Sequence, residues 1–181
     1  MFDLPGHILI LTGPPGSGKS TTASLLVAAS RGPAVHVHSD DFWRFIKKGA
    51  IPPYLPESQR QNEMVMRVVA QAAKGYAGGG YFVIVDGIVG PWFLYAFRAL
   101  LQPLHYVVLR PDRYAAIQRC RERGGDALSD PETIRALHQQ FCGLGELESH
   151  VIETAGHDRE ETLAAVEAAL VSRRFRLGAT N

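Results

Sequence analysis

Gly13-Pro14-Pro15-Gly16-Ser17-Gly18-Lys19-Ser20 is the stretch that decides the fold, because it fits the pattern Gly-x-x-x-x-Gly-Lys-Ser/Thr at every fixed position. It follows the apolar run 8–11 (Ile-Leu-Ile-Leu) and precedes a helix-like run over 21–29. A strand, a glycine-rich loop and a helix in this order are the context in which the pattern holds phosphate groups. The sequence therefore predicts a nucleotide-binding loop rather than a turn that merely connects a strand with a helix.

The residue types of this loop suit phosphate binding. Glycines let backbone N–H groups approach phosphate oxygens closely, and the helix that begins at Gly18 directs its positive dipole end at the same anion. Lys19 supplies a mobile charge for the β- and γ-phosphates, and the Ser20 hydroxyl is placed to bind Mg²⁺. The expected nucleotide-binding residues of the loop are Gly13, Pro14, Pro15, Gly16, Ser17, Gly18, Lys19, Ser20 and Thr21.

The composition predicts a single domain over residues 1–181, with 46% hydrophobic and 20% charged residues. A net charge of +1 provides no global field that would favour nucleic acid or a membrane surface. The two cysteines lie in helix-like segments, which is typical of thiols in a reducing compartment. The N-terminus lacks a signal-peptide pattern, and no run reaches the roughly 18 apolar residues of a membrane-spanning helix. We therefore expect a cytoplasmic protein without a membrane partner.

Short apolar runs alternate with longer helical patterns along the whole chain. The predicted strands are 7–11, 34–38, 81–85, 104–109 and 150–153. The predicted helices are at about 18–30, 57–74, 92–101, 112–123, 131–142 and 159–173. Near-continuous apolar strands are typical of a parallel sheet covered on both faces, so the alternation predicts a three-layer, doubly wound α/β fold.

Two carboxylates, Asp40 and Asp41, follow the second predicted strand. Ligands of open α/β sheets lie at the carboxyl ends of the strands, so both should lie near a γ-phosphate held by Lys19. One of them could accept a proton from an attacking hydroxyl, and Asp40 is the stronger candidate. The alternative is that Ser39 or Asp40 only caps a helix over 41–48.

A further acidic residue, Asp86, follows the third predicted strand and precedes Gly87. An aspartate at this position can hold Mg²⁺ through water or bind an acceptor hydroxyl, and Gly87 would let the backbone approach a ligand. The alternative is a turn-forming Asp-Gly pair. Ser20 and Asp86 are therefore the expected metal-binding residues.

A run of arginines lies between the fourth strand and the pair Gly124-Gly125. Arg119 and Arg123 are four residues apart, so they lie on one helix face and could together bind phosphate oxygens. The glycine pair suits a hinge for a helical lid at about 119–131. A solvated helix face is the alternative for these arginines.

Aromatic residues could form one wall of an acceptor pocket. Phe42 and Trp43 follow the two aspartates, Trp92 follows the third strand, and the Pro-rich segment 51–56 is too rigid for a helix. A loop that only covers the core is an equal alternative for 51–56. The expected substrate-binding residues are Asp41, Phe42, Trp43, Asp86 and Gly87.

His36 and His38 alternate on one face of the second predicted strand. No third residue has metal-ligand spacing relative to them in the sequence. We therefore do not expect a metal site at these histidines.

These residues together make the chain similar to the small-molecule kinases of the P-loop superfamily, the group that includes shikimate kinase, gluconate kinase, adenylylsulfate kinase and chloramphenicol phosphotransferase. The resemblance covers nearly the whole chain. It implies a five-stranded parallel sheet in the order 2-3-1-4-5, the cofactors ATP and Mg²⁺, and transfer of the γ-phosphoryl group to an acceptor hydroxyl.

The resemblance also implies roles for single residues. Asp40 matches the acidic residue that serves as base, while Arg119 and Arg123 match the lid arginines. Together with Lys19, these residues form the expected catalytic set. Gly156 lies in the segment after the last strand where members of the group receive adenine. The insert after Lys48 has no counterpart, and the resemblance leaves the acceptor unassigned and both a monomer and a homodimer open.

Two other functions remain open. Residues 39–42 (Ser-Asp-Asp-Phe) are similar to the Arg-Asp-Asp-Tyr stretch of polynucleotide 5′-hydroxyl kinases. Aromatic residues interleaved with a basic groove are sparse, however, so we do not expect a nucleic-acid partner. The other candidate is a switch protein in which the nucleotide orders a lid for a partner and little transfer occurs.

Overall fold

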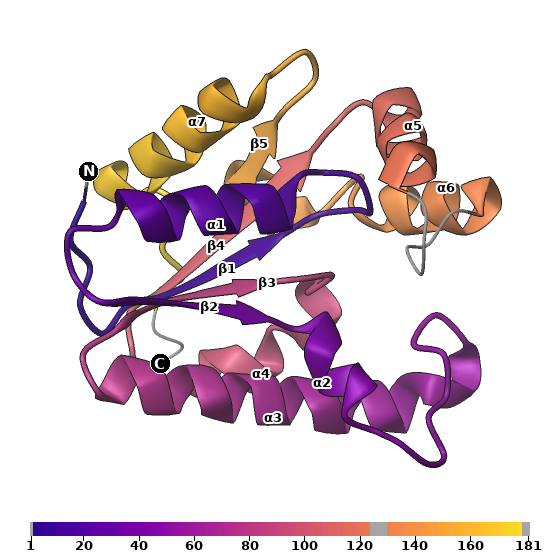
Figure 1. Ribbon diagram of the computed structural model, residues 1–181, viewed down its shortest axis with the longest axis horizontal. Coiled ribbons are helices and arrows are strands. Elements are labelled where there is room, and N and C mark those ends of the chain that lie inside the picture. Colours follow the sequence, from indigo (N-terminus) through magenta and orange to yellow (C-terminus); the bar gives the residue numbers. More distant parts are fainter. Residues whose placement is uncertain (1, 124–129, 179–181) are drawn as a thin grey trace.

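The computed structural model describes residues 2–123 and 130–178, and it contains a five-stranded parallel sheet with helices on both faces (Figure 1). The strands are β1 (Ile8–Thr12), β2 (Ala34–His38), β3 (Phe82–Asp86), β4 (Leu104–Arg110) and β5 (Val151–Glu153). Their order is β2-β3-β1-β4-β5, and each neighbouring pair is parallel. The predicted fold class and strand order are confirmed.

The helices cover the two faces of the sheet and one of its ends (Figure 1). One face carries α1 (Lys19–Ala29) and α7 (Arg159–Ser172), and the other carries α3 (Gln59–Gly78) and α4 (Tyr95–Arg98). At the carboxyl ends of the strands lie α2 (Asp40–Arg44), α5 (Arg113–Arg123) and α6 (Pro131–Gln140). Short 3₁₀ helices span Pro56–Ser58, Pro91–Phe93 and Gly145–His150.

Two predicted helices are shorter than expected. The pattern at 92–101 is divided into the 3₁₀ helix that begins at Pro91 and the single turn α4, and the expected helix at 41–48 ends as α2 at Arg44. No helix of the described residues is both long and apolar enough to cross a membrane. The expected lid, at about 119–131, includes 124–129, which lie outside the described residues.

The buried strands explain why the sequence shows continuous apolar runs. In β1, Ile8 and Ile10 pack into the core on the α3 side, whereas Leu9 and Leu11 pack into the core on the α1 and α7 side. All four side chains have 0% exposure. A strand that is buried on both faces needs an apolar side chain at every position, which abolishes the usual alternation.

A pair of histidines lies toward the amino ends of the strands. His7 precedes β1, and its Nδ1 is 3.0 Å from Nε2 of His105 on β4. His105 is fully buried, so desolvation, together with the nearby His7, Arg176 and Arg173, lowers the pKa of His105 to about 4. The pair belongs to the packing of β1 against β4 and is built from neutral imidazoles.

This histidine pair predicts a loss of stability in acid. The unfolded chain takes up a proton at His105 near pH 6.5, but the folded chain does so only near pH 4. The free energy of unfolding should therefore be undiminished above pH 6.5 and should fall between pH 6.5 and 4, by roughly 3 kcal/mol for this group. Urea unfolding across this range should show a free energy of unfolding that depends less on pH in His105→Gln. An unchanged pH dependence in that variant would contradict the role given to His105.

Candidate functional site

The loop between β1 and α1 comprises residues 13–20 and is called the phosphate loop below. At its start, Gly13 has a φ of 145°, and a Cβ atom there would lie 2.2 Å from the Leu109 carbonyl oxygen. Gly18, which precedes α1, has a φ of 85° but faces open space. Gly13 is thus required by close packing against β4, and Gly18 by backbone conformation alone.

This difference between the two glycines can be measured. Gly13→Ala should lower the free energy of unfolding by roughly 2–3 kcal/mol, because the methyl group overlaps backbone that cannot move without distorting β4. Gly18→Ala is the matched control in the same loop and should cost about 1 kcal/mol, the strain of a left-handed residue. Urea unfolding of both variants tests the order, and equal losses would contradict it.

The ammonium group of the phosphate loop bonds within the loop, whereas the hydroxyl group of Ser20 bonds to the end of β3. Nζ of Lys19 donates to the Pro14 carbonyl oxygen at 2.9 Å and to Oγ of Ser17 at 3.4 Å. Oγ of Ser20 donates to Oδ2 of Asp86 at 2.5 Å, which joins the start of α1 to the end of β3. Thr21 is exposed on the first turn of α1. The expected ammonium and hydroxyl groups are therefore both at the loop, and Ser20 and Asp86 are in contact.

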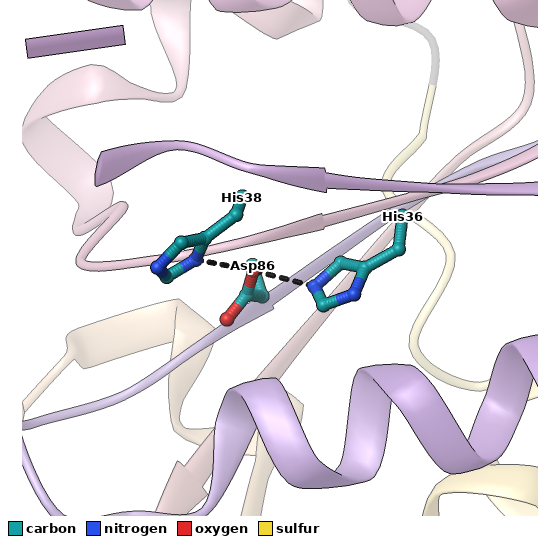
Figure 2. Close-up of side chains that lie close together, drawn as sticks. All are labelled: His36, His38 and Asp86. Atoms are coloured by element: carbon teal, nitrogen blue, oxygen red, sulfur yellow. Dashed lines mark hydrogen bonds and ion pairs between the residues drawn. The ribbon is translucent and has the colours of Figure 1, made fainter. Parts of the chain in front are cut away.

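Asp86 is the centre of a compact cluster (Figure 2). Its Oδ1 lies 2.7 Å from Nε2 of His36 and 2.8 Å from Nδ1 of His38, while its side chain is 0% exposed. The strands cause this arrangement, because β2 pairs with β3 and His38 lies directly opposite Asp86. Asp86 is thus a third possible ligand beside His36 and His38, and the sequence spacing concealed it because Asp86 is close to these histidines only in the fold.

The surroundings of Asp86 keep it ionised. Burial alone would raise its pKa, but hydrogen bonds from His36, His38 and Ser20 outweigh burial and hold the pKa well below its usual range. In return, the hydrogen bond to Asp86 raises the pKa of His38, against the effect of desolvation. Because its carboxylate bonds to these side chains of β2 and α1, Asp86 does more than form a local Asp-Gly turn.

The two aspartates after β2 differ in their surroundings. Asp41 forms an ion pair with Arg44 at 3.1 Å on the exposed side of α2. Asp40 is exposed, and its Oδ1 lies 3.9 Å from the point where a Cβ of Gly87 would stand. Ser39 occupies the N-cap position of α2, but its side chain makes no capping hydrogen bond. Asp40 is thus the aspartate that lies beside the end of β3.

Gly87 allows β2 and β3 to end close together. The Ser39 amide donates to the Asp86 carbonyl oxygen at 2.9 Å, and a Cβ at Gly87 would stand 1.8 Å from Oγ of Ser39. A side chain at Gly87 would therefore displace the residue that precedes Asp40. Gly87 belongs to the site through this close approach.

The arginines have different surroundings. Nη1 of Arg119 lies 3.4 Å from the Gly16 carbonyl oxygen, so α5 brings Arg119 to the phosphate loop. Arg123 is the last residue of α5, and its side chain lies outside the described part of the chain. Arg110, which begins the predicted arginine run, bonds to Glu148, to Glu153 and to the Phe141 carbonyl oxygen. Arg110 therefore joins β4 to β5 and to the end of α6.

The expected aromatic wall is only partly assembled. Nε1 of Trp43 donates to Oδ1 of Asn62 at 2.8 Å, and Nδ2 of Asn62 donates to the Pro53 carbonyl oxygen at 2.8 Å. Trp43 and the Pro-rich segment are therefore anchored to α3. Phe42 is half-buried, while Trp92 packs against Phe141, and within residues 2–123 and 130–178 no ring contact joins Trp92 to the other two.

The segment after β5 contains Gly156 in an exposed turn with a φ of 78°. The His157 amide donates to the Thr154 carbonyl oxygen at 3.2 Å and closes this turn. Asp158 forms a capping box with Glu161 and starts α7. This segment thus begins α7, beyond the edge strand β5, and the role of Gly156 stays a prediction.

A parallel sheet of this order, with a phosphate loop between its first strand and first helix, defines a P-loop nucleotide-binding fold. Residues 9–137 match the AAA domain family. The chain therefore belongs to the AAA domain family. No curated protein sequence matches it significantly.

The chain is also similar in fold to solved kinase structures. A thymidylate kinase from Candida albicans is 15% identical with a TM-score of 0.67, and the match covers 94% of each chain. A gluconokinase from Sinorhizobium meliloti 1021 is 16% identical with a TM-score of 0.67, over 93% of this chain and 94% of the other. A shikimate kinase from Acinetobacter baumannii, in complex with shikimate, is 21% identical with a TM-score of 0.65 over 94% of each chain. The fold is thus that of the P-loop kinases.

Proposed function

We propose that this protein transfers the γ-phosphoryl group of ATP to a hydroxyl group of a small molecule. The observation that carries the proposal is the position of Asp40, an exposed carboxylate beside the end of β3, where Asp86 contacts Ser20 of the phosphate loop. Phosphoryl transfer requires a phosphate-binding loop and a base that can reach the acceptor, and here both lie at the carboxyl ends of the strands. The similar structures are a thymidylate kinase, a gluconokinase and a shikimate kinase, whose acceptors differ in chemistry. What such acceptors share with the one proposed here is a group that receives the phosphoryl group, here a hydroxyl.

The residues of the site fit the expected cofactors. Ser20 and Asp86 offer a hydroxyl and an ionised carboxylate in direct contact, and Mg²⁺ prefers such oxygen ligands. The glycine-rich turn before α1, with Lys19 folded over it, fits the phosphate groups of ATP. When bound, Mg²⁺ would neutralise charge on the phosphates.

Each residue then has a physical role in the proposal. Lys19 binds the transferred group electrostatically, and Arg119 approaches the same group from α5. Arg123 would join Arg119 from the last turn of α5. Asp40 orients the acceptor hydroxyl and accepts its proton at a carboxylate oxygen.

The acceptor-binding region lies around the same carboxylate. The residues that would border the acceptor are Asp41, Phe42 and Trp43, which follow Asp40 in the chain, and Gly87, which lies beside Asp40 in space. Trp43 would contribute a ring face, because its indole N–H already bonds to Asn62.

The test is to incubate the untagged protein with γ-labelled ATP and Mg²⁺, offering a metabolite extract and a 5′-hydroxyl oligonucleotide in parallel. Label on a small molecule, absent with Lys19→Ala, would support the proposal and supply the acceptor for identification. Label on the oligonucleotide would favour a polynucleotide 5′-hydroxyl kinase. Bound ATP without transfer to either would favour a nucleotide-dependent switch.

A further inference from the structure

We propose that His36, His38 and Asp86 form a binding site for a divalent transition-metal ion such as Zn²⁺. The three side chains each offer one ligand atom, and these atoms all lie within 4.8 Å of one another (Figure 2). Two imidazoles and a carboxylate form a common set of protein ligands for such ions. The proposal does not depend on the kinase function.

The distances allow a metal ion after a small movement. Oδ1 of Asp86 lies 2.7 Å from Nε2 of His36 and 2.8 Å from Nδ1 of His38. Ligands at about 2.0–2.2 Å from a tetrahedral Zn²⁺ are roughly 3.3 Å apart, so each imidazole nitrogen must move about 0.5 Å away from Oδ1. The two imidazole nitrogens lie within 4.8 Å of each other and must adopt the same spacing. Their side chains are 24% and 34% exposed, which leaves them room to rotate and leaves an entry path for the ion.

The sheet fixes the positions of the ligands. His36 and His38 are two residues apart on β2 and therefore project from the same face of the sheet. His38 pairs directly with Asp86 on β3, and both strands belong to the five-stranded sheet. Ligands on adjacent strands keep their spacing better than ligands on loops.

The carboxylate is also oriented as a metal ligand usually is. Its Oδ2 accepts the hydroxyl hydrogen of Ser20, while Oδ1 faces the imidazoles. Metal-binding carboxylates commonly accept such a second hydrogen bond, which sets their orientation. Oδ1 of Asp86 therefore contacts the two histidines, and Oδ2 contacts Ser20 of the phosphate loop.

The ligand chemistry distinguishes this site from the Mg²⁺ position proposed at Ser20 and Asp86. Imidazole nitrogen suits Zn²⁺, Cu²⁺ or Ni²⁺, whereas Mg²⁺ prefers an all-oxygen octahedron. A bound transition metal would contact Oδ1 on the β2 side. Excess Mg²⁺ should therefore not displace it.

The competing explanation is that both imidazoles only donate hydrogen bonds to Oδ1. Two substitutions separate the explanations, because Gln places its amide nitrogen near the position of Nε2 and Asn near the position of Nδ1. His36→Gln and His38→Asn thus retain the hydrogen-bond donors but remove the imidazole ligands. Cys142→Ser is the control, since Cys142 and His138 form another pair of possible transition-metal ligands, with Sγ 3.8 Å from Nδ1.

The experiment is calorimetric titration of untagged protein with Zn²⁺ and, separately, Co²⁺, in excess Mg²⁺ and without nucleotide. We expect one bound ion, an affinity lowered about tenfold or more in His36→Gln and in His38→Asn, and unchanged binding in Cys142→Ser. Absence of a bound ion, or equal affinity in the histidine variants, would overturn the proposal, as would loss of binding in Cys142→Ser.

A measurement on the unsubstituted protein makes the result independent of variant folding. Nitrogen-15 NMR of the imidazole rings should show Zn²⁺ bound through Nε2 of one histidine and Nδ1 of another, as the distances require. Unchanged ring nitrogen shifts on addition of Zn²⁺ would overturn the proposal.

Discussion

Lys19→Ala is expected to reduce phosphoryl transfer by on the order of 10²–10³-fold or more, the loss associated with removing one preorganised group that stabilises developing charge. Nζ of Lys19 lies 2.9 Å from the Pro14 carbonyl oxygen, so the ammonium group is held over the phosphate loop. Alanine leaves the backbone amides of the loop but removes the mobile positive charge that phosphate oxygens require. Transfer of labelled phosphate measures the effect, and fluorescent-nucleotide binding shows how much of it arises in ATP affinity.

The matched control is Lys74→Ala, which removes an exposed lysine from α3. It changes the net charge by the same amount but leaves the phosphate loop intact, so transfer should be retained. Similar losses in both variants, or full transfer in Lys19→Ala, would contradict the proposed role of Lys19. Thermal unfolding of both variants would show whether either substitution impairs folding.

Asp40→Asn is expected to lower the turnover number by roughly 10²–10⁴-fold, the range for loss of a general base. The amide has the size of the carboxylate but cannot accept the proton of the acceptor hydroxyl. The binding of ATP should persist, because Asp40 is the first residue of α2 and does not belong to the phosphate loop. The measurement is single-turnover transfer to the acceptor identified with labelled ATP, together with nucleotide affinity.

Asp41→Asn is the comparator for Asp40→Asn, since it makes the same chemical change one residue further along α2. The carboxylate of Asp41 already pairs with Arg44, so it is less suited than that of Asp40 to accept a proton from the acceptor. We expect a change of less than about tenfold, felt mainly in acceptor affinity. A larger loss in Asp41→Asn than in Asp40→Asn would transfer the role of base to Asp41, and full turnover in both would favour a switch protein.

Much of the fold could be predicted from local patterns. The five strands begin within one residue of their predicted starts. The inner strands β1, β3 and β4 are buried along nearly their whole length, and such parallel strands leave nearly continuous apolar runs. Helix ends were less predictable. The pattern at 92–101 forms a 3₁₀ helix and a single α-helical turn, and the pattern at 41–48 ends at Arg44. Hydrophobic periodicity shows which residues share a helix face, but it does not show where the helical hydrogen bonds end.

The candidate site could be predicted only in part. The phosphate loop, Asp40 and Asp86 were expected near one another because each lies at or just after the carboxyl end of a strand. The surroundings of Trp43 and Arg110 were not recognisable. Trp43 bonds to Asn62 on α3, and Arg110 bonds to glutamates beyond α6, and neither partner is close in the sequence.

The amino-acid sequence by itself determined the alternation of strands and helices and the phosphate-binding character of residues 13–20, because both depend on residues that are close along the chain. The tertiary structure alone decided that Asp86 meets Ser20, His36 and His38. These contacts arise because β3 lies between β2 and β1, so side chains of β2 and α1 converge on the end of one buried strand.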